Sequence, residues 1–198
     1  MKKIILALTI LTIILLSWAV KAEEKNMKTL IVYFSRTGEQ YSVGNITKGN
    51  TAIVAEMIAR ETNGDLFEVK LQSDTYPAGY TELTQVAKQE KSQNTRPAII
   101  GDVENFDDYD IVFVGSPVWW ADMPMALYTF IEKHDWSGKT VVPFVTHEGS
   151  GLSEIPANLK KATGAKTLSG LAIYGHEAQN SPDKVQTKVS VWLKELGF

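Results

Sequence analysis

The sequence predicts an α/β protein with a doubly wound, five-stranded parallel sheet. Its strand-like segments, such as residues 30–34 and 110–115, contain continuous apolar runs, as expected of strands covered on both faces. Segments with the apolar spacing of helices separate these runs, which indicates strands joined by helical crossovers. We therefore expect the strand order 2-1-3-4-5, with ligands bound beyond the carboxyl ends of strands 1, 3 and 4.

The first half of the chain is expected to contain two strands and two helices. After the strand at 30–34, residues 50–62 form a helix, because apolar side chains at 53, 54, 57 and 58 share one face. Residues 66–71 alternate between apolar and polar, which predicts the second strand. Residues 80–93 are predicted to be a polar helix. The connection 72–109, which contains this helix, is expected to be irregular around residues 76–80.

The second half is expected to continue the alternation to the end of the chain. The predicted strands cover 110–115, 140–146 and 165–174, and the predicted helices cover 125–132, 153–163 and 182–196. No internal repeat or interdomain linker interrupts the pattern. The 198 residues, 44% of them hydrophobic, suit one domain, which we place at 27–198.

Residues 1–22 have the pattern of a secretory signal peptide. Lys2 and Lys3 precede the uncharged apolar run 4–20, and Val20 and Ala22 occupy positions −3 and −1 of a cleavage site. The run is close to the lower limit of about 17 residues for crossing a bilayer, so an uncleaved N-terminal anchor is the alternative. Either way the domain is expected to be exported, with membrane attachment only if the segment is retained.

Composition excludes several classes of function. The chain has no cysteine, which rules out disulfides, thiol catalysis and cysteine-ligated metal or iron–sulfur centres. The net charge is −3, and removal of residues 1–22, which carry three lysines and no acidic residue, would change it to −6. No Lys/Arg cluster offsets this acidity, so no nucleic-acid partner is expected.

The most informative feature is a hydroxyl-rich turn between the first strand and the first helix. Ser35-Arg36-Thr37-Gly38 leaves the strand, and Asn50-Thr51 opens the helix, whose free N–H groups and dipole favour an anion. The turn resembles the Thr/Ser-x-Thr-Gly-x-Thr loop of the flavodoxin family, which binds the phosphate of FMN. The resemblance implies phosphate contacts by Ser35, Thr37, Gly38, Asn50 and Thr51. Residues 39–49 are extra to the compact form of this loop.

Other phosphate loops fit this turn less well. The stretch 44–51 has the glycine spacing of a P-loop, but Asn50 stands where that loop needs lysine. The dinucleotide fingerprint G-x-G-x-x-G is absent from the turn. An ordinary polar turn without a ligand stays open, since Ser, Thr and Gly are common turn residues.

Two further loops resemble the parts of flavodoxins that hold the flavin ring. After the third strand, Pro117-Val118-Trp119-Trp120 is similar to an isoalloxazine-binding loop. Adjacent tryptophans on an extended chain point to opposite sides, so one can pack inward and the other stack on a planar ligand. Trp119 is slightly favoured for the ring contact. Packing of both against the core or an interface is the alternative.

The loop after the fourth strand completes the resemblance. Thr146-His147-Glu148-Gly149-Ser150 is similar to the turn whose amides meet the pyrimidine edge of the flavin, and its glycine allows close approach of the backbone. No aromatic residue follows within 147–152, so the outer flavin face is either open or covered by Tyr41, Tyr76 or Tyr80.

Hydrolase and metal chemistry find little support. Ser150 lacks the G-x-S-x-G pattern of a nucleophile elbow, and the three histidines lack metal-binding spacing. No catalytic side chain and no metal site are expected.

Taken together, the three loops imply an exported flavodoxin-like protein with noncovalent FMN, which carries the redox chemistry. An electron carrier, exchanging electrons with partner proteins or a small-molecule acceptor, is favoured because no nicotinamide-binding motif is visible. The alternatives are an FMN-dependent NAD(P)H:quinone-type oxidoreductase and a flavin-free binding module.

Overall fold

The computed structural model describes residues 27–73 and 75–198, so the predicted signal peptide lies outside the described residues. Five strands form a parallel sheet in the predicted order: β4 (Asp65–Glu68), β1 (Thr29–Tyr33), β7 (Ile111–Pro117), β8 (Thr140–His147) and β10 (Leu171–Tyr174). All neighbouring pairs are parallel. The predicted α/β fold is therefore confirmed.

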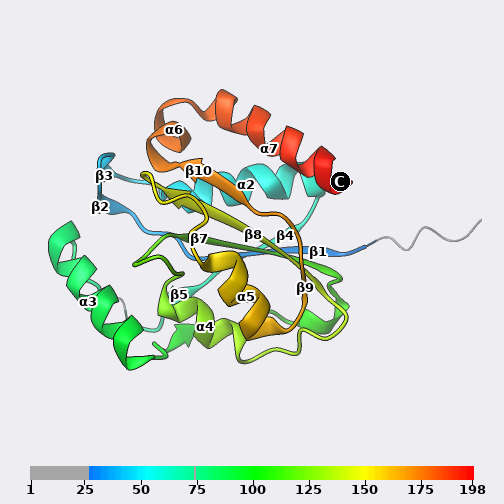
Figure 1. Cartoon of the computed structure of the whole chain (residues 1–198), viewed down its shortest axis with the longest axis horizontal. Coiled ribbons are helices and arrows are strands. Elements are labelled where there is room, and N and C mark those ends of the chain that lie inside the picture. The colour runs from blue at the N-terminus through cyan, green and yellow to red at the C-terminus, as the bar shows by residue number, and fades with distance from the viewer. Residues whose placement is uncertain (1–26, 74) are drawn as a thin grey trace, which may run out of the picture.

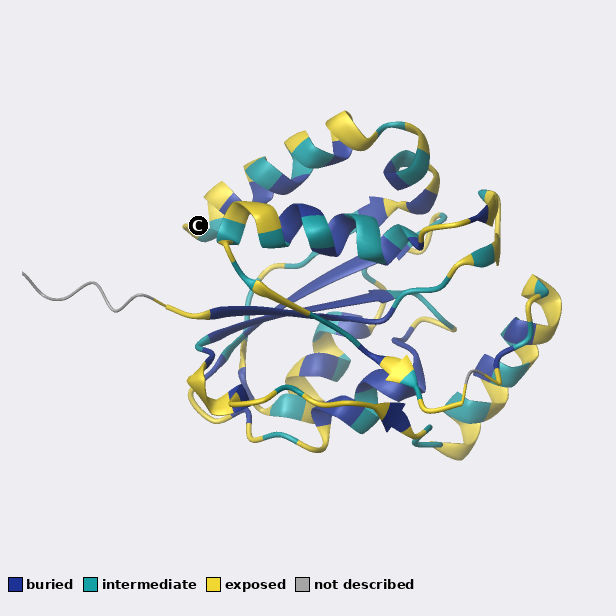
Figure 2. Cartoon of the chain, turned by 180° about the vertical axis from the view of Figure 1, so that it is seen from behind, coloured by how far each residue is buried: buried dark blue, intermediate teal, exposed yellow. Residues whose placement is uncertain are grey.

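Helices cover both faces of this sheet (Figure 1). On one face lie α2 (Asn50–Thr62), α6 (Gly175–Asn180) and α7 (Pro182–Leu196), and on the other lie α4 (Met125–Ile131) and α5 (Ile155–Thr163). The burial pattern in Figure 2 shows the sheet as a dark layer between the two helical layers. The central strands β1, β7 and β8 are covered on both sides, which is why they read as largely apolar runs, whereas the edge strand β4 is partly exposed and carries Asp65 and Glu68.

Successive side chains of each strand enter different cores. In β1, Leu30 and Val32 pack with the α4 and α5 side, whereas Ile31 and Tyr33 pack with the α2 and α7 side. This alternation follows from the pleat of the strand. The register places Gly115 of β7 beside Phe144 of β8.

The fifth strand differs from the prediction of one strand over 165–174. Two short pieces, β9 (Lys166–Thr167) and β10, pair with β8 on either side of a break. Thr167 pairs with Val141 and Leu171 with Phe144, so three residues of the fifth strand face two of β8, one of which is Pro143. Proline has no N–H to donate to a neighbouring strand, which accounts for the interruption at this point.

The extra residues of the first loop form a small hairpin. Strands β2 (Gly38–Gln40) and β3 (Gly44–Ile46) pair antiparallel between the two halves of the predicted phosphate loop. The 72–109 connection holds α3 (Tyr80–Gln93), the strand β6 (Ile99–Ile100), which pairs with β5 (Lys70–Leu71), and the 3-10 helix η1 (Phe106–Asp108). The alternating segment 66–71 is thus divided between two sheets. In Figure 1, α3 lies at the edge of the molecule near the hairpin.

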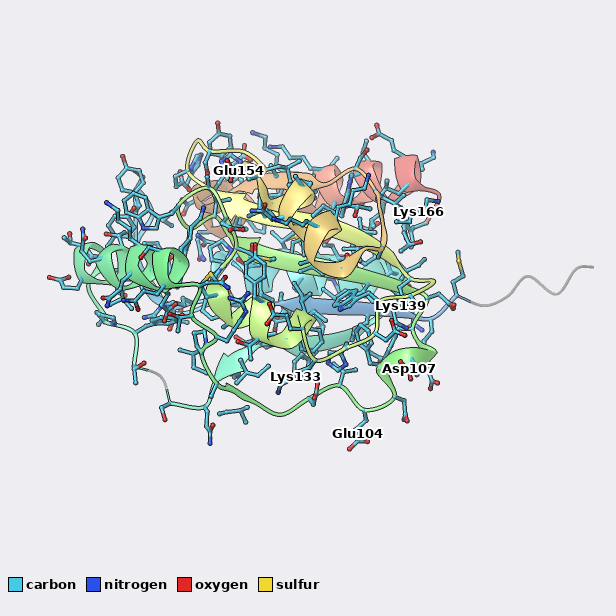
Figure 3. All side chains as sticks on the ribbon, turned by 60° about the horizontal axis from the view of Figure 1, so that its bottom comes forward. Glu104, Asp107, Lys133, Lys139, Glu154 and Lys166 are labelled. Atoms are coloured by element: carbon cyan, nitrogen blue, oxygen red, sulfur yellow. The ribbon has the colours of Figure 1, made fainter. Side chains whose placement is uncertain are left out.

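A buried lysine holds the opposite end of the molecule together. Lys139 lies beside Asp107, away from α3 in Figure 3, and only 6% of it is exposed. Its Nζ donates to the carbonyl oxygens of Phe106, Asp107 and Tyr109 at 3.0, 3.2 and 2.8 Å. Its three donors are therefore satisfied by the backbone around η1, which makes it a structural rather than a reactive amine.

Candidate functional site

A cavity of about 420 Å³ lies at the carboxyl ends of β1, β7 and β8, where the strand order predicts a ligand. Its size falls within the range of small-molecule sites, roughly 300–1,000 Å³. The loops after these three strands form one side of it. The β2–β3 hairpin and α3 form the other.

The two halves of the first loop meet at the start of α2. Ser35 Oγ accepts a hydrogen bond from the backbone N–H of Ala52 at 3.1 Å, and Ile53 N–H donates to the carbonyl of Gly49 at 3.2 Å. Gly49 approaches so closely that an added Cβ would lie 2.1 Å from Ser35 Oγ. A side chain at 49 would force the halves apart, so glycine is needed to bring Ser35, Asn50 and Thr51 to one cavity.

We call Ser35, Asn50 and Thr51 the cradle. The hydroxyl groups of Ser35 and Thr51 can each donate a hydrogen bond to a ligand. Ser35 Oγ uses a lone pair for Ala52, which leaves its own hydrogen available to a ligand. Thr51 Oγ1 lies 2.8 Å from Thr146 Oγ1 in a buried contact, and either hydroxyl can be the donor. When Thr146 donates, the Thr51 hydrogen is free. The arrangement suits an acceptor such as a phosphate oxygen.

The helix α6, which the sequence did not predict, supports the cradle from outside. Gln179 Nε2 donates to Asn50 Oδ1 at 2.7 Å and to the carbonyl of Lys48 at 2.8 Å. Both contacts join residues far apart in the chain. They fix the orientation of the Asn50 amide at the cavity.

The second loop carries a strained turn at the tryptophan pair. Trp119 N–H donates to the Asp122 carbonyl at 2.7 Å, and Asp122 N–H donates back at 3.0 Å. Trp120 and Ala121 between them have φ of 53° and 64°, a turn that normally holds Asn and Gly. Each such residue costs roughly 1–3 kcal/mol, which the surrounding contacts must offset.

The two tryptophans have different surroundings, although both line the cavity. Trp119 packs edge-on against Phe34 and Tyr76, each with a centroid distance of 5.4 Å. Trp120 is 45% exposed, and its indole N–H donates to the Thr84 carbonyl of α3 at 2.8 Å. Trp119 is therefore the inward-packed member of the pair. Which of the two contacts a flavin ring stays a prediction.

The third loop presents a neutral histidine. His147 Nδ1 accepts a hydrogen bond from Gly149 N–H at 2.8 Å, so the ring proton is placed on Nε2. Partial burial lowers the pKa of His147, against the opposing effect of the Glu148 carboxylate, and the imidazole is neutral at pH 7. The Glu148 carboxylate itself accepts bonds from the backbone N–H and Nδ1 of His176, at 2.8 and 2.7 Å.

Comparison with protein families gives a decisive match. The family model described as Flavodoxin matches residues 28–187. The chain belongs to the flavodoxin family. A comparison with curated proteins finds no match.

Solved structures agree with this assignment to the flavodoxin family. A candidate flavoprotein from Bacteroides eggerthii is 30% identical over 83% of this chain and 96% of its own, with a TM-score of 0.65. A second, from Bacteroides uniformis, is 29% identical over 84% and 99%, with a TM-score of 0.66. A flavoprotein from Lactobacillus acidophilus, solved in complex with FMN, has the same fold at 24% identity over 83% and 99%, with a TM-score of 0.62.

Most residues of the flavodoxin-like pattern come together in the cavity. Those that line it are Ser35, Asn50, Thr51, Pro117, Val118, Trp119, Trp120, Thr146, His147, Glu148 and Ser150. Thr37, Gly38 and Gly149 are not among the lining residues. Thr37 is exposed and Gly38 begins the hairpin, because the insertion carries the chain away from the cradle directly after Arg36.

The sequence predicted only Tyr41 and Tyr80, as candidates for the outer flavin face, from the side of the cavity formed by Arg36, the hairpin and α3. The residues of this side are Arg36, Gln40, Tyr41, Val43, Tyr80, Leu83, Thr84 and Ala87. The α3 members follow helical i, i+3, i+4, i+7 spacing, the one signal that could have indicated a shared face. Of the three tyrosines considered for the outer flavin face, Tyr41 and Tyr80 line the cavity, whereas Tyr76 is buried beneath Trp119.

Two further features of residues 27–73 and 75–198 bear on function. These residues contain no cluster of three potential metal ligands. Over the same residues, none of the helices has the length and apolarity needed to cross a membrane.

Proposed function

We propose that this flavodoxin-family protein binds FMN noncovalently and passes electrons through it. The observation that carries the proposal is that one cavity joins a hydroxyl-lined helix N-terminus to a tryptophan pair and a glycine-containing loop. These parts suit the phosphate, the ring faces and the polar ring edge of FMN. The FMN complex of the Lactobacillus relative supports the choice of this flavin.

The phosphate would be held by the cradle of the first loop. Ser35 and Thr51 donate hydroxyl hydrogens, and the first turn of α2 adds its dipole and amide groups. Arg36, which lines the same cavity, supplies a positive charge that Ser and Thr cannot. Its guanidinium is held by the Pro77 carbonyl at 3.1 Å and lies over the Tyr76 ring.

The ring would be held by the second and third loops. The tryptophans provide aromatic surface, and His147 provides a neutral imidazole with an N–H on Nε2. Bound FMN supplies the redox chemistry. The chain's own residues position the ring, limit its contact with water and set the charge around it.

We propose a redox partner protein, rather than NAD(P)H, as the electron donor. No nicotinamide-binding motif is present in the sequence, which favours a carrier over an NAD(P)H-dependent enzyme. Steady-state assays of NADH and NADPH oxidation by the FMN-loaded protein, with a quinone as acceptor, test this choice. Sustained turnover would favour the oxidoreductase alternative.

FMN titration tests the central proposal. Flavin-free protein should quench and shift the absorption and fluorescence of added FMN with one-to-one stoichiometry. Riboflavin, which lacks the phosphate, should bind more weakly. Absence of a signal with FMN would leave a flavin-free binding module as the function.

We also propose that the domain is exported and acquires FMN after export. The support is the pattern of residues 1–22, which carries no twin arginine and so favours export of the unfolded chain. Mass spectrometry of the protein from the producing cell should show cleavage after Ala22. Export that requires prior FMN binding in the cytoplasm would contradict the proposal.

A further inference from the structure

Three exposed aromatic side chains surround one side of the cavity. Tyr41 of the hairpin, Tyr80 of α3 and Trp120 of the second loop are 59%, 37% and 45% exposed, and all three line the cavity. We call these residues the aromatic rim. Exposed aromatic residues grouped around a hollow indicate a binding surface. Tyr80 lies on α3, outside the three loops that are proposed to hold FMN, and Tyr41 lies in the hairpin that is inserted into the first of them.

The rim is held in place by specific contacts. The Tyr41 and Tyr80 rings stack with centroids 5.5 Å apart, and the Glu39 carboxylate accepts the backbone N–H of Tyr80 at 2.9 Å. Trp120 is fixed from α3, because its indole N–H donates to Thr84 and its carbonyl accepts from Lys91 Nζ at 2.7 Å. These bonds keep the Trp120 side chain at the cavity despite its strained backbone.

The surface behind the rim is concave. Together with Tyr80, the residues Leu83, Thr84 and Ala87 form the part of α3 that lines the cavity. Partner proteins dock on surfaces that bury roughly 800 Å² per partner, which a recess of this size does not offer by itself. A concave aromatic recess fits a small planar molecule.

The charge at the rim narrows the class of ligand. Lys88 Nζ lies 5.0 Å from the centroid of the Trp120 ring. Within the described part of the chain, Lys88 forms no ion pair, so no carboxylate neutralises its charge beside Trp120. A positive charge beside an aromatic face suits a planar ligand with carbonyl oxygens or an acidic substituent.

We propose that the aromatic rim binds a planar aromatic dicarbonyl compound of the quinone class, which accepts electrons from reduced FMN. The inference rests on the proposed FMN function and adds the acceptor to it. Two electrons and two protons leave the reduced flavin and join the two carbonyl oxygens, so the quinone becomes a hydroquinone and FMN returns to its oxidised form. Stacking on the rim would place the acceptor in the cavity that also holds the flavin.

The test uses the FMN-loaded protein, photoreduced without oxygen and mixed in a stopped-flow instrument with 2-methyl-1,4-naphthoquinone. In the double variant Tyr41→Leu/Tyr80→Leu, two aromatic contacts are lost while apolar bulk remains. Reoxidation by the naphthoquinone should slow about tenfold. Reoxidation by ferricyanide, which has no planar ring, should change less than about twofold, with every rate measured on protein saturated with FMN.

A second variant tests the charge. Lys88→Gln should slow reoxidation by 1,4-naphthoquinone-2-sulfonate by about threefold or more, and leave reoxidation by the uncharged naphthoquinone within about twofold. The single variant Tyr41→Leu, at the most exposed position, serves if the double variant does not fold, with a naphthoquinone-specific loss of about threefold.

The possible results separate the two levels of the proposal. Failure of the unaltered protein to bind FMN rejects the proposed function. Normal FMN binding with unchanged naphthoquinone rates in the rim variants overturns the acceptor site alone. Equal slowing of naphthoquinone and ferricyanide, or slowing confined to cytochrome c as a protein acceptor, also overturns it, the latter by assigning the rim to protein docking.

Discussion

The hydroxyl of Ser35 links the backbone of α2 to the cavity. Its oxygen accepts the Ala52 N–H, and its hydrogen remains for a ligand, so the helix polarises the group that would meet the phosphate. Thr51 is placed in a similar way by its buried contact with Thr146. Thr37 belongs to the same sequence motif but is exposed and outside the cavity lining. Thr37 therefore serves as a control for substitutions at Ser35 and Thr51.

Ser35→Ala and Thr51→Ala should each weaken FMN binding by about ten- to a hundredfold, because a hydrogen bond to a charged group contributes roughly 1.5–3 kcal/mol. Riboflavin binding should change little in both variants. Thr37→Ala is the control and should leave both affinities unchanged. Fluorescence titration of the two flavins measures all three. A loss for Thr37→Ala equal to that for Thr51→Ala would support the motif over the cavity geometry.

Gly115 of β7 and Phe144 of β8 lie side by side in close contact. A Cβ at 115 would lie 2.0 Å from Phe144 Cζ, and both residues are buried. The aromatic ring fills the space that a side chain on β7 would occupy. This contact lies just before Ser116 and Pro117, where β7 leads into the tryptophan loop, so it helps to set the position of that loop.

Gly115→Ala should destabilise the folded protein by about 1–3 kcal/mol, since the core cannot absorb the extra methyl group. Phe144→Leu in the Gly115→Ala background should recover part of the loss, although Phe144→Leu alone should also destabilise. Urea unfolding of the single and double variants gives the coupling free energy. Additive losses would show that the two side chains do not compete for space.

The strands and helices that the sequence predicted correctly are those with a clear local pattern of apolar residues. Residues 30–34, 110–115 and 140–146 read as buried strands because each contains an uninterrupted apolar run, and α2, α3 and α7 begin and end at the predicted residues. The break opposite Pro143 was not predicted, because it depends on which strand lies beside β8. The hairpin and the six-residue helix α6 are too short for a periodic signal.

The residues of the candidate site likewise fall into those that the local sequence predicts and those that depend on long-range contacts. Residues adjacent to strand ends, such as Ser35 and His147, were predicted because the carboxyl ends of parallel strands share one edge. Thr84 was not predicted, and Tyr80 was only one of three candidates for the outer flavin face, because the place of both at the cavity depends on how α3 docks against the Trp120 loop. That docking depends on long-range contacts such as the bond between Thr84 and Trp120.

Acid should destabilise the protein through at least two groups. Hydrogen bonds from Lys184 and Lys188 lower the pKa of Glu177 to about 2, and burial lowers the pKa of His147. In both cases the unfolded chain binds more protons than the folded one, so stability falls with pH. The His147 contribution is lost as pH falls below about 6.5, and the Glu177 contribution, complete above about 4.5, is lost as pH falls through about 2.

Glu177→Gln should lower stability at pH 7 by about 1 kcal/mol, the range of exposed ion pairs, because Lys184 and Lys188 are partly exposed. The difference from the unaltered protein should shrink as pH falls from about 4.5 towards 2, where the carboxylate becomes protonated. Urea unfolding at pH 7, 4 and 3 measures the difference. A difference independent of pH would show that the pairing with α7 is not the cause.

The close approach of Ser35 and Gly49 separates the hairpin from the cradle, so that the two can evolve independently. The chain departs from the cradle after Arg36 and returns at Gly49, with its ends already touching, so the hairpin between them is a closed insert. Doubling the length of such an insert costs only about 0.6 kcal/mol in closure entropy. A lineage could therefore exchange or shorten the hairpin, and with it Tyr41, without rebuilding the cradle. Descendants of one ancestral domain could keep the same cofactor while diverging in the molecules with which they exchange electrons.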